Sequence, residues 1–246
     1  MTDERGGALR ADLALVGAGL FESRAKAREA IEAGLVRADG RLLSRPAATV
    51  HAGARLEAAA PHLWVSRGGV KLAAALDQFD IDPAGRHCLD AGASTGGFCD
   101  VLLQRGAASV LAVDVGHGQL HPRLRDEPRL RLLEHRDART LTAADLPVSP
   151  NLITVDVSFI SLRLVLPALL PLAGAGALAV LLVKPQFEAG PARVTKGIVR
   201  DPAVRAEVGE AVSAAVTALG WTVLGLMPSP IEGGDGNRES LLAARR

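Results

Sequence analysis

The sequence has few cysteines, few aromatic residues and almost no net charge. Its two cysteines, Cys88 and Cys99, form no C-x-x-C pair and no Cys/His spacing, so we expect buried thiols in the reducing cytoplasm and no disulfide framework. None of the six histidines lies in a ligand-like cluster, which predicts that the protein holds no metal. The net charge is +1, so nucleic-acid binding must come from a local basic patch.

The chain lacks an apolar leader and contains one long uncharged run. Residues 1–10 are polar and charged, which argues against a signal peptide. The run from Leu164 to Val183 is nearly all apolar, but it is interrupted by prolines and glycines and has no tryptophan or tyrosine near its ends. We therefore expect a buried helix (162–172), a turn and a strand (177–183) rather than a membrane span.

Lysine is also scarce, since only four of the 28 basic residues are lysine: Lys26, Lys71, Lys184 and Lys196. Arginine supplies plain positive charge but stays protonated in proteins, whereas a lysine can lose its proton and act as a base. The four lysines are therefore candidates for roles that arginine cannot fill.

A Gly-rich turn between a strand and a helix is the main candidate for ligand binding. A buried strand ends near Leu89, the turn begins at Asp90, Ser94-Thr95 offers a helix N-cap, and the helix runs over 98–105. The turn matches neither a dinucleotide fingerprint nor a phosphate loop. A second strand (109–114) ends in Asp114, where an acid binds the two ribose hydroxyls of a nucleoside. Together these features suggest S-adenosylmethionine.

The expected contacts of this cofactor come from the ends of three strands. We expect Asp90, Gly92, Ala93, Ser94, Thr95 and Gly96 around the methionine end, Asp114 on the ribose, Val115 against the adenine, and Asp137 and Ala138 near the adenine amino group. Phe98 is expected in the core.

The N-terminal part predicts a small α+β domain. We expect a helix (10–20) with Leu9, Leu13 and Val16 on one side, then a helix (24–33) capped by Ser23 and stopped by Gly34, a hairpin turning at Asp39-Gly40, and a strand (54–59). The pattern S-R-x-K-A-x-x-x-I-x-x-G-x-V-x-x-D-G (23–40) resembles an S4 RNA-binding domain over roughly residues 8–60. That resemblance and the local basic charge imply RNA contacts by Arg24, Lys26, Arg28, Arg37 and Arg41.

The remainder alternates apolar strands with helices and predicts a mostly parallel sheet covered on both faces. The strands are expected at 87–90, 109–114, 130–134, 151–156, 177–183 and 221–227, with a last antiparallel strand near 239–242, and the helices at 70–79, 98–105, 162–172 and 202–219. We expect domain 1 at 1–60, a linker at 61–66 and domain 2 at 67–246.

Several motifs share one resemblance across nearly the whole chain: S-R-G-G-V-K-L (66–72), L-D-A-G-A-S-T-G-G-F (89–98), V-D-V-G-H-G-Q-L (113–120), D-V-S-F-I-S-L (156–162), K-P-Q-F-E (184–188), K-G-I-V-R-D (196–201) and G-N-R-E (236–239). On these motifs the chain resembles the TlyA family of ribosomal-RNA 2′-O-methyltransferases. The resemblance implies a Rossmann-like class I methyltransferase domain of the FtsJ/RrmJ type, with S-adenosylmethionine as donor and a ribose 2′-hydroxyl of ribosomal RNA as acceptor. Arg67 and Lys196 are further candidates for RNA contact.

The resemblance also implies a Lys-Asp-Lys-Glu active site, which maps onto Lys71, Asp156, Lys184 and Glu239. A ribose hydroxyl is a poor nucleophile and must lose its proton as it attacks. Lys184 ends an apolar strand, where desolvation and a nearby cation such as Lys71 would favour the neutral amine, so it is the candidate general base. Asp156 would position this lysine, while Glu239 and Lys71 would orient the base and the acceptor ribose.

The choice of substrate and two alternatives remain open at this stage. Longer family members extend beyond the position of Arg246, and the short form resembles members expected to modify a cytidine of the large-subunit RNA alone. Some members are labelled haemolysins, which would make the protein membrane-active. A non-catalytic factor in ribosome assembly, with S4 and Rossmann parts, is the other alternative. Binding of S-adenosylmethionine would separate an enzyme from a pore-former.

Overall fold

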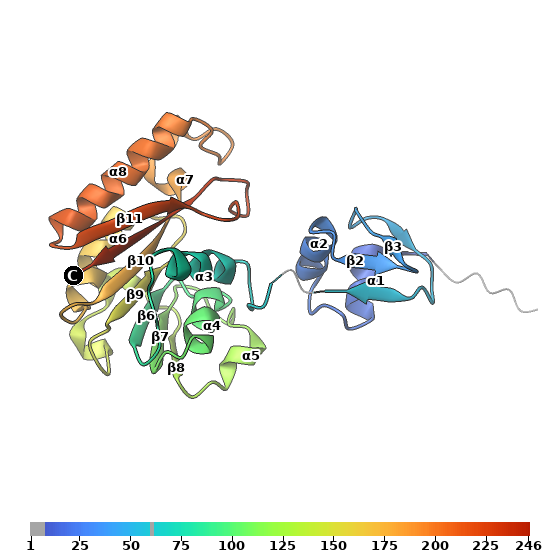
Figure 1. Cartoon of the computed structure of the whole chain (residues 1–246), viewed down its shortest axis with the longest axis horizontal. Helices are drawn as coiled ribbons and strands as arrows, with labels where there is room; N and C mark the ends of the chain where they lie inside the picture. The colour runs from blue at the N-terminus through green and yellow to red at the C-terminus, as the bar shows by residue number, and fades with distance from the viewer. Residues whose placement is uncertain (1–7, 60–61) are drawn as a thin grey trace, which may run out of the picture. The chain divides into compact units, whose positions relative to one another are not determined.

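The computed structural model of the chain describes residues 8–59 and 62–246, which fall into two compact units divided between Leu63 and Trp64 (Figure 1). Residues 1–7 and 60–61 lie outside the described part. The expected first domain (1–60) begins and ends there, and the expected linker (61–66) begins there.

The first unit combines two helices with short strands. In chain order its elements are β1 (Leu9–Arg10), α1 (Ala11–Gly17), α2 (Arg24–Glu32), β2 (Val36–Ala38), β3 (Arg41–Leu42), β4 (Thr49–Val50) and β5 (Leu56–Ala58). Strands β3, β2 and β5 form an antiparallel sheet, and β1 pairs with β4. Helix α2 has the expected cap, because Ser23 Oγ accepts the Lys26 N–H, and Gly34 after it takes a positive φ.

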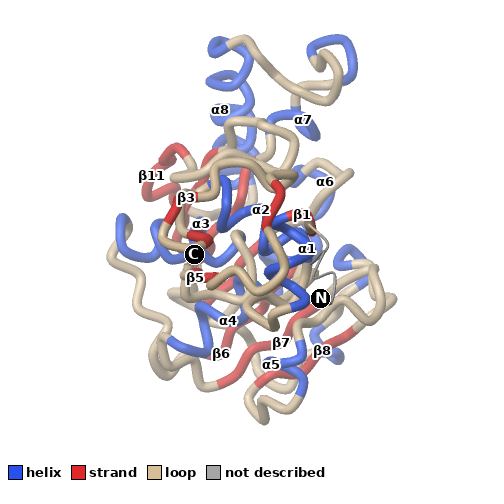
Figure 2. The backbone as a smooth tube through the Cα atoms, turned by 90° about the vertical axis from the view of Figure 1, so that its right-hand side faces the viewer, coloured by secondary structure: helices blue, strands red, loops and turns tan. Residues whose placement is uncertain are grey.

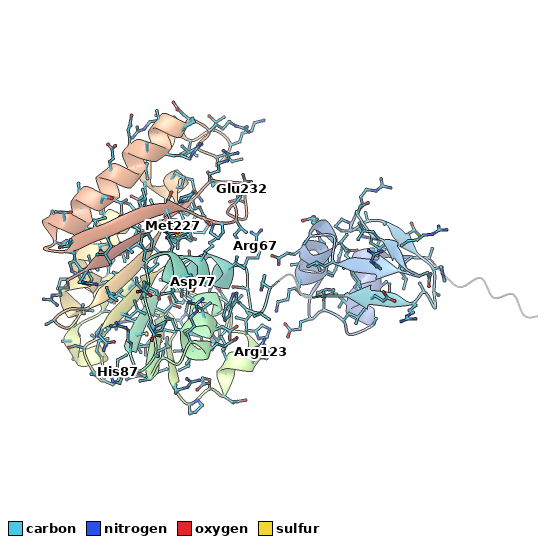
Figure 3. The ribbon with its side chains drawn as sticks, viewed as in Figure 1. Arg67, Asp77, His87, Arg123, Met227 and Glu232 are labelled. Carbon is cyan, nitrogen blue, oxygen red and sulfur yellow. The ribbon has the colours of Figure 1, made fainter. Side chains whose placement is uncertain are left out.

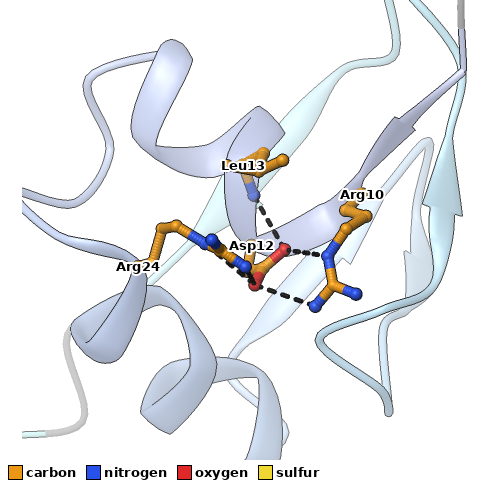
Figure 4. Close-up of polar contacts among 4 residues, drawn as sticks. All are labelled: Arg10, Asp12, Leu13 and Arg24. Carbon is orange, nitrogen blue, oxygen red and sulfur yellow. Dashed lines mark hydrogen bonds and ion pairs between the residues drawn. The ribbon is translucent and has the colours of Figure 1, made fainter.

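The buried face of α1 differs from the predicted one. Leu13 is 41% exposed, whereas Leu15 is fully buried. Asp12 is also fully buried on this face, and its carboxylate accepts hydrogen bonds from Arg10 Nε (3.0 Å) and Arg24 Nη2 (2.9 Å) (Figure 4). Of the three residues expected on one side of this helix, Val16 packs against the core, whereas Leu9 and Leu13 are exposed. The apolar pattern missed part of the buried face because the charged Asp12 lies there, where two arginines compensate its burial.

The second unit is built on a seven-stranded sheet with the order β11-β12-β10-β9-β6-β7-β8. The strands are β6 (His87–Ala91), β7 (Ser109–Val113), β8 (Leu130–Leu133), β9 (Leu152–Val155), β10 (Leu178–Val183), β11 (Thr222–Pro228) and β12 (Ser240–Arg245). Strand β12 runs antiparallel to β10 and β11, and the pairs among β10, β9, β6, β7 and β8 are parallel. Strands β6, β7 and β8 lie side by side in Figure 2.

Helices cover both faces of this sheet. The helices are α3 (Gly68–Gln78), α4 (Gly97–Gln104), α5 (Pro122–Arg125), α6 (Leu162–Leu169), α7 (Pro185–Glu188) and α8 (Pro202–Ala218), with short 3-10 helices at Ala138–Thr140, Ala143–Asp145, Leu170–Leu172 and Pro191–Arg193. One core contains apolar residues of α3, α4 and α5, including Phe98, and the other those of α6 and α8. Neighbouring strand residues such as Cys88 and Leu89 belong to opposite cores, as the pleat requires. The fold is the predicted α/β one.

The uncharged run is confirmed as helix, turn and strand. It spans part of α6, a 3-10 turn and β10, and Pro167 lies inside α6. No helix within residues 8–59 and 62–246 is long and apolar enough to cross a membrane.

The N-cap predicted for α4 at Ser94-Thr95 is wrong. Ser94 and Thr95 lie before the cap of α4, which is Gly96 in the left-handed region (φ 90°), and no side chain caps this helix. A side chain at Gly96 would collide with Leu124, since its Cβ would lie 2.4 Å from the Leu124 Cδ1. The left-handed backbone and the close packing against α5 favour glycine at the cap position, so the cap lies at Gly96 and not at the hydroxyl residues before it.

Candidate active site

A pocket of about 450 Å³ opens at the carboxyl ends of the central parallel strands. The sheet order changes direction there, because β6 pairs with β7 on one side and with β9 on the other. Ligands of open α/β sheets bind at this switch point. The lining residues come from the end of β7 and from the segments that follow β6, β7, β8 and β9, including the start of α6: Gly92, Ser94, Val113, Asp114, Val115, Gly116, Gln119, Arg136, Asp137, Ala138, Arg139, Asp156, Val157, Ser158, Phe159, Ile160 and Val165.

Gly92 holds the loop after β6 against the loop after β9. Its φ is +89°, and a Cβ on it would lie 2.4 Å from the Asp156 carbonyl oxygen. The Asp156 N–H donates to the Ala91 carbonyl at 2.8 Å. A side chain at this position would push the two loops apart, so the close approach requires glycine.

Asp114, at the end of β7, presents its carboxylate to the pocket. One oxygen accepts the Ser94 N–H and the other accepts the Gly116 N–H, each at 2.7 Å. A carboxylate oxygen has a second lone pair, so this fixed group still accepts hydrogen bonds from two ligand hydroxyls. The geometry fits the ribose of a nucleoside.

Six of the ten residues expected to hold the cofactor line the pocket: Gly92, Ser94, Asp114, Val115, Asp137 and Ala138. The Asp137 carboxylate also binds the Arg139 guanidinium (2.6 Å), and these hydrogen bonds lower the Asp137 pKa. Ala93, Thr95 and Gly96 shape the turn without lining the pocket.

Asp90 is buried behind the pocket and does not line it. Its carboxylate accepts hydrogen bonds from Thr154 Oγ1 (2.7 Å) and Cys99 Sγ (2.9 Å). Burial raises the pKa of Asp90 to about 6, although both hydrogen bonds oppose the shift. Both carboxylate oxygens of Asp90 thus bond inside the core.

Sequence reasoning missed Gln119, Gly116 and the apolar Ile160 on the pocket wall. Gln119 Oε1 accepts a hydrogen bond from Ser94 Oγ at 3.2 Å and so joins the two loops. These residues lie in motifs that the sequence had already singled out (113–120 and 156–162), but only the fold shows which positions face inward.

The four residues of the expected catalytic set form two ion pairs at this edge of the sheet. Lys184 Nζ lies 2.6 Å from Asp156 Oδ1 and donates a hydrogen bond to Ser158 Oγ at 2.7 Å. Asp156 and Ser158 line the pocket, so the Lys184 ammonium sits beside it.

The second pair, Lys71 with Glu239, is more deeply buried. Lys71 Nζ donates to Glu239 Oε2, and the side chains are 9% and 3% exposed. Strands β10 and β12 pair Val183 with Ser240, so Lys184 and Glu239 leave neighbouring strands at the same edge. Each of the two lysines thus has its own carboxylate partner.

The loop after β9 is fastened to α7 at two points. Glu188, the last residue of α7, accepts hydrogen bonds from Ser161 Oγ and the Leu162 N–H, both at 2.6 Å. Phe159 stacks at a tilt on Phe187, with ring centroids 5.2 Å apart, and it is 92% exposed at the pocket wall. A large apolar ring so exposed at a pocket is suited to contact a planar ligand group.

The residues expected to bind RNA lie on the surface of both units. Arg28 and Arg41 are exposed, Lys26 pairs with Glu22 (2.9 Å), and Arg24 is held by Asp12. Arg37 donates to the Gly40 carbonyl (3.0 Å). In the second unit Lys196 is exposed after α7, and Arg67 lies just before α3 (Figure 3). The part of the chain that the structure describes contains no cluster of three or more potential metal ligands.

Comparison with known proteins identifies the family. Residues 64–246 match the FtsJ-like methyltransferase family, and residues 9–56 match the S4 domain. A Mycobacterium tuberculosis (strain H37Rv) protein named 16S/23S rRNA (cytidine-2′-O)-methyltransferase TlyA is 48% identical over 239 residues, 96% of this chain and 89% of that protein. The chain belongs to the TlyA family. It is a methyltransferase with an FtsJ-like catalytic part and an S4 domain.

Other members of the family carry different names. A Campylobacter jejuni (strain 81-176) protein named 23S rRNA (cytidine-2′-O)-methyltransferase TlyA is 38% identical over 179 residues, 72% of this chain and 69% of that protein. The solved structure of a hemolysin-named protein from Streptococcus thermophilus is 41% identical, covers 98% of this chain and 89% of that one, and superposes with a TM-score of 0.77.

Proposed function

We propose that this TlyA-family methyltransferase methylates the ribose 2′-hydroxyl of a cytidine in ribosomal RNA, with S-adenosylmethionine as donor and large-subunit RNA as the favoured substrate. The names of the relatives from Mycobacterium tuberculosis and Campylobacter jejuni support the acceptor, since both name a cytidine 2′-hydroxyl and both include 23S RNA. The observation that carries the proposal is that the Lys184–Asp156 pair borders the pocket whose wall includes Asp114.

The pocket fits S-adenosylmethionine in size and chemistry. Its volume lies within the range of cofactor sites, and Asp114 offers two acceptor atoms for the ribose. Gly92 and Ser94 would hold the methionine end, with Asp137 and Ala138 near the adenine and Val115 against its ring. Asp90, Ala93, Thr95 and Gly96 would act by shaping the turn.

The proposed chemistry assigns each ion pair one task. S-adenosylmethionine, when bound, supplies a methyl group activated by a cationic sulfur. Lys184 Nζ, once it is the free amine, accepts the proton of the 2′-hydroxyl as the oxygen attacks. Asp156 and Ser158 hold Nζ at the pocket, and the buried pair of Lys71 and Glu239 orients the acceptor ribose beside it.

We further propose that the exposed basic residues grip the RNA backbone. In the first unit these are Arg24, Lys26, Arg28, Arg37 and Arg41, and in the second Arg67 and Lys196. Contacts of this kind follow RNA shape rather than sequence, and they weaken as salt rises. The exposed Phe159 ring would stack on the acceptor base at the pocket.

The test is methyl transfer from labelled S-adenosylmethionine to isolated large and small ribosomal subunits. Lys184→Ala removes the base, and Lys184→Arg keeps a cation beside Asp156 but cannot lose its proton. We expect label on large-subunit RNA, at a linkage that resists alkaline cleavage, and none with either variant although both bind the cofactor.

Other outcomes change specific parts of the proposal. Label on both subunits removes the large-subunit preference but keeps the enzyme. Full activity of Lys184→Arg would eliminate Lys184 as the general base. Failure of the wild type to bind S-adenosylmethionine would favour a non-catalytic role in ribosome assembly.

A further inference from the structure

Asn237 is a fully buried polar residue outside the cofactor pocket. Its side chain binds a segment that lies about forty residues earlier in the sequence, at Gly197 and Val199. Oδ1 accepts the Val199 N–H at 3.0 Å, and Nδ2 donates to the Gly197 carbonyl at 2.8 Å. The Val199 N–H needs an acceptor and the Gly197 carbonyl needs a donor, so one orientation of the Asn237 amide satisfies both groups.

The segment held by Asn237 is a tight turn that carries Lys196. Thr195 and Ile198 pair through two backbone hydrogen bonds of 3.0 Å, and Lys196 at the tip has a positive φ of 50°. This 195–198 turn contributes no residue to the two cores of the second unit. Val194 and Val199, on either side of the turn, pack in the core with α6 and α8, so they fix its two ends. Asn237 adds side-chain hydrogen bonds to Gly197, inside the turn, and to Val199, directly after it.

The backbone of Asn237 shapes the surroundings of Glu239. The Gly233 N–H donates to the Asn237 carbonyl at 2.8 Å, which closes the loop between β11 and β12. A Cβ at Gly233 would lie 2.6 Å from Glu239 Oε1, so this loop wraps closely around the carboxylate that binds Lys71. The same loop carries Glu232, labelled in Figure 3.

We propose that Asn237 is a positioning residue that fixes the Lys196 turn relative to Glu239, so that RNA held at Lys196 presents its ribose to the catalytic groups. This inference rests on the proposed function. It assigns the role to the amide because replacing it leaves the buried Val199 N–H without a partner and removes the part-buried hydrogen bond to the Gly197 carbonyl. A buried N–H without a partner favours movement of its segment toward water.

Steady-state kinetics of the full chain test the inference. For Asn237→Ala we expect the KM for ribosomal RNA to rise about tenfold and kcat to fall, while the Kd for S-adenosylmethionine stays within about twofold. The matched control is Asn151→Ala. The Asn151 Oδ1 likewise accepts a backbone N–H, that of His87 (2.9 Å), but at the opposite edge of the sheet, so its loss should leave the RNA KM unchanged.

A double mutant separates positioning from general damage. Lys196→Ala alone should raise the RNA KM, and adding it to Asn237→Ala should change the KM little further, because the turn has already lost its position. Additive effects, an unchanged KM in Asn237→Ala, or a wild-type KM in Lys196→Ala would each overturn the inference. If Asn237→Ala does not fold, Asn237→Asp takes its place, since it keeps the acceptor for Val199 and sets a carboxylate oxygen in place of the donor to the Gly197 carbonyl.

Hydrogen exchange gives a readout that does not depend on activity. The Val199 amide should exchange at least tenfold faster in Asn237→Ala than in the wild type, and at the wild-type rate in Asn151→Ala. Unchanged exchange overturns the inference. If the wild type methylates no RNA, the proposed function fails, while exchange still decides whether Asn237 holds the turn.

Discussion

Two fully buried aspartates, Asp12 and Asp90, should have opposite effects on stability when each is replaced by asparagine. Within the described residues the Asp90 carboxylate accepts hydrogen bonds from the Cys99 thiol and the Thr154 hydroxyl and pairs with no cation, and burial raises its pKa to about 6. Asp12 binds Arg10 and Arg24, and the hydrogen bond from Arg10 is the main reason that its pKa is lowered. Asp90→Asn and Asp12→Asn therefore form a matched pair.

The magnitude for Asp90 follows from its pKa. A shift from 3.8 to about 6 means that the ionised carboxylate destabilises the folded state by about 3 kcal/mol at neutral pH. Because the folded state binds the proton more tightly than the unfolded state, the free energy of unfolding falls as pH rises from about 4 to about 6, and then stays level. The penalty is about 1 kcal/mol at pH 4.5 and about 3 kcal/mol at pH 7.5.

Asp90→Asn removes this penalty, since the amide oxygen still accepts one hydrogen bond and the amide nitrogen faces groups that also accept. We expect urea unfolding to show a gain in stability at pH 7.5 of up to about 3 kcal/mol, shrinking to about 1 at pH 4.5. Asp12→Asn should lose stability at pH 7.5, because it leaves two arginines without their carboxylate.

Equal stability changes for Asp90→Asn at both pH values would refute the reasoning, because they would show that the carboxylate is not the source of the pH dependence. A loss of stability at pH 7.5 would show that the ionised form is well solvated by Cys99 and Thr154. The variant also tests the position of Asp90. Its Kd for S-adenosylmethionine should stay within about threefold of the wild type, whereas a direct contact with the amino group of the cofactor would cost tenfold or more.

Three further substitutions probe the loops of the site. Gly92→Ala should raise the Kd for S-adenosylmethionine at least tenfold and lower the melting temperature, because its Cβ meets the Asp156 carbonyl; calorimetry and thermal unfolding measure both. Glu188→Gln should destabilise the second unit by about 1–2 kcal/mol in urea unfolding, since it weakens the hydrogen bonds to Ser161 and Leu162. Phe159→Ala should leave stability unchanged but lower kcat/KM for RNA about tenfold in the methyl-transfer assay, whereas an unchanged kcat/KM would exclude stacking.

The sheet of the second unit was predictable because buried parallel strands are continuous apolar runs. The strand predicted at 177–183 is β10, Leu178–Val183, and the others agree to within one or two residues except at the last strand, which is longer. Short elements were missed, including α5 and α7, since four residues leave too little periodicity to read.

The details of the site depend on contacts that are distant in sequence. Asp90 was expected on the pocket wall because it ends a strand, but Thr154 and Cys99 hold its carboxylate in the core. Which lysine meets which acid is decided by partners 168 residues apart in one pair, Lys71 with Glu239. No local pattern encodes such a pairing, so the motifs could name these residues without giving their arrangement.

The scarcity of lysine singled out four residues, and the structure separates them by burial. The Lys71 side chain is 9% exposed and its ammonium binds the Glu239 carboxylate; an arginine there would bury five N–H donors and leave most of them without acceptors. Lys184 is 12% exposed and fits its compact charge between Asp156 and Ser158. Lys26 instead forms an exposed i,i+4 pair with Glu22, a contact that arginine makes equally well. In an arginine-rich chain, scarcity therefore points to a role that arginine cannot fill only where the lysine is also buried, because only there do the size and number of donors matter. An exposed lysine such as Lys196 makes contacts that an arginine could make as well.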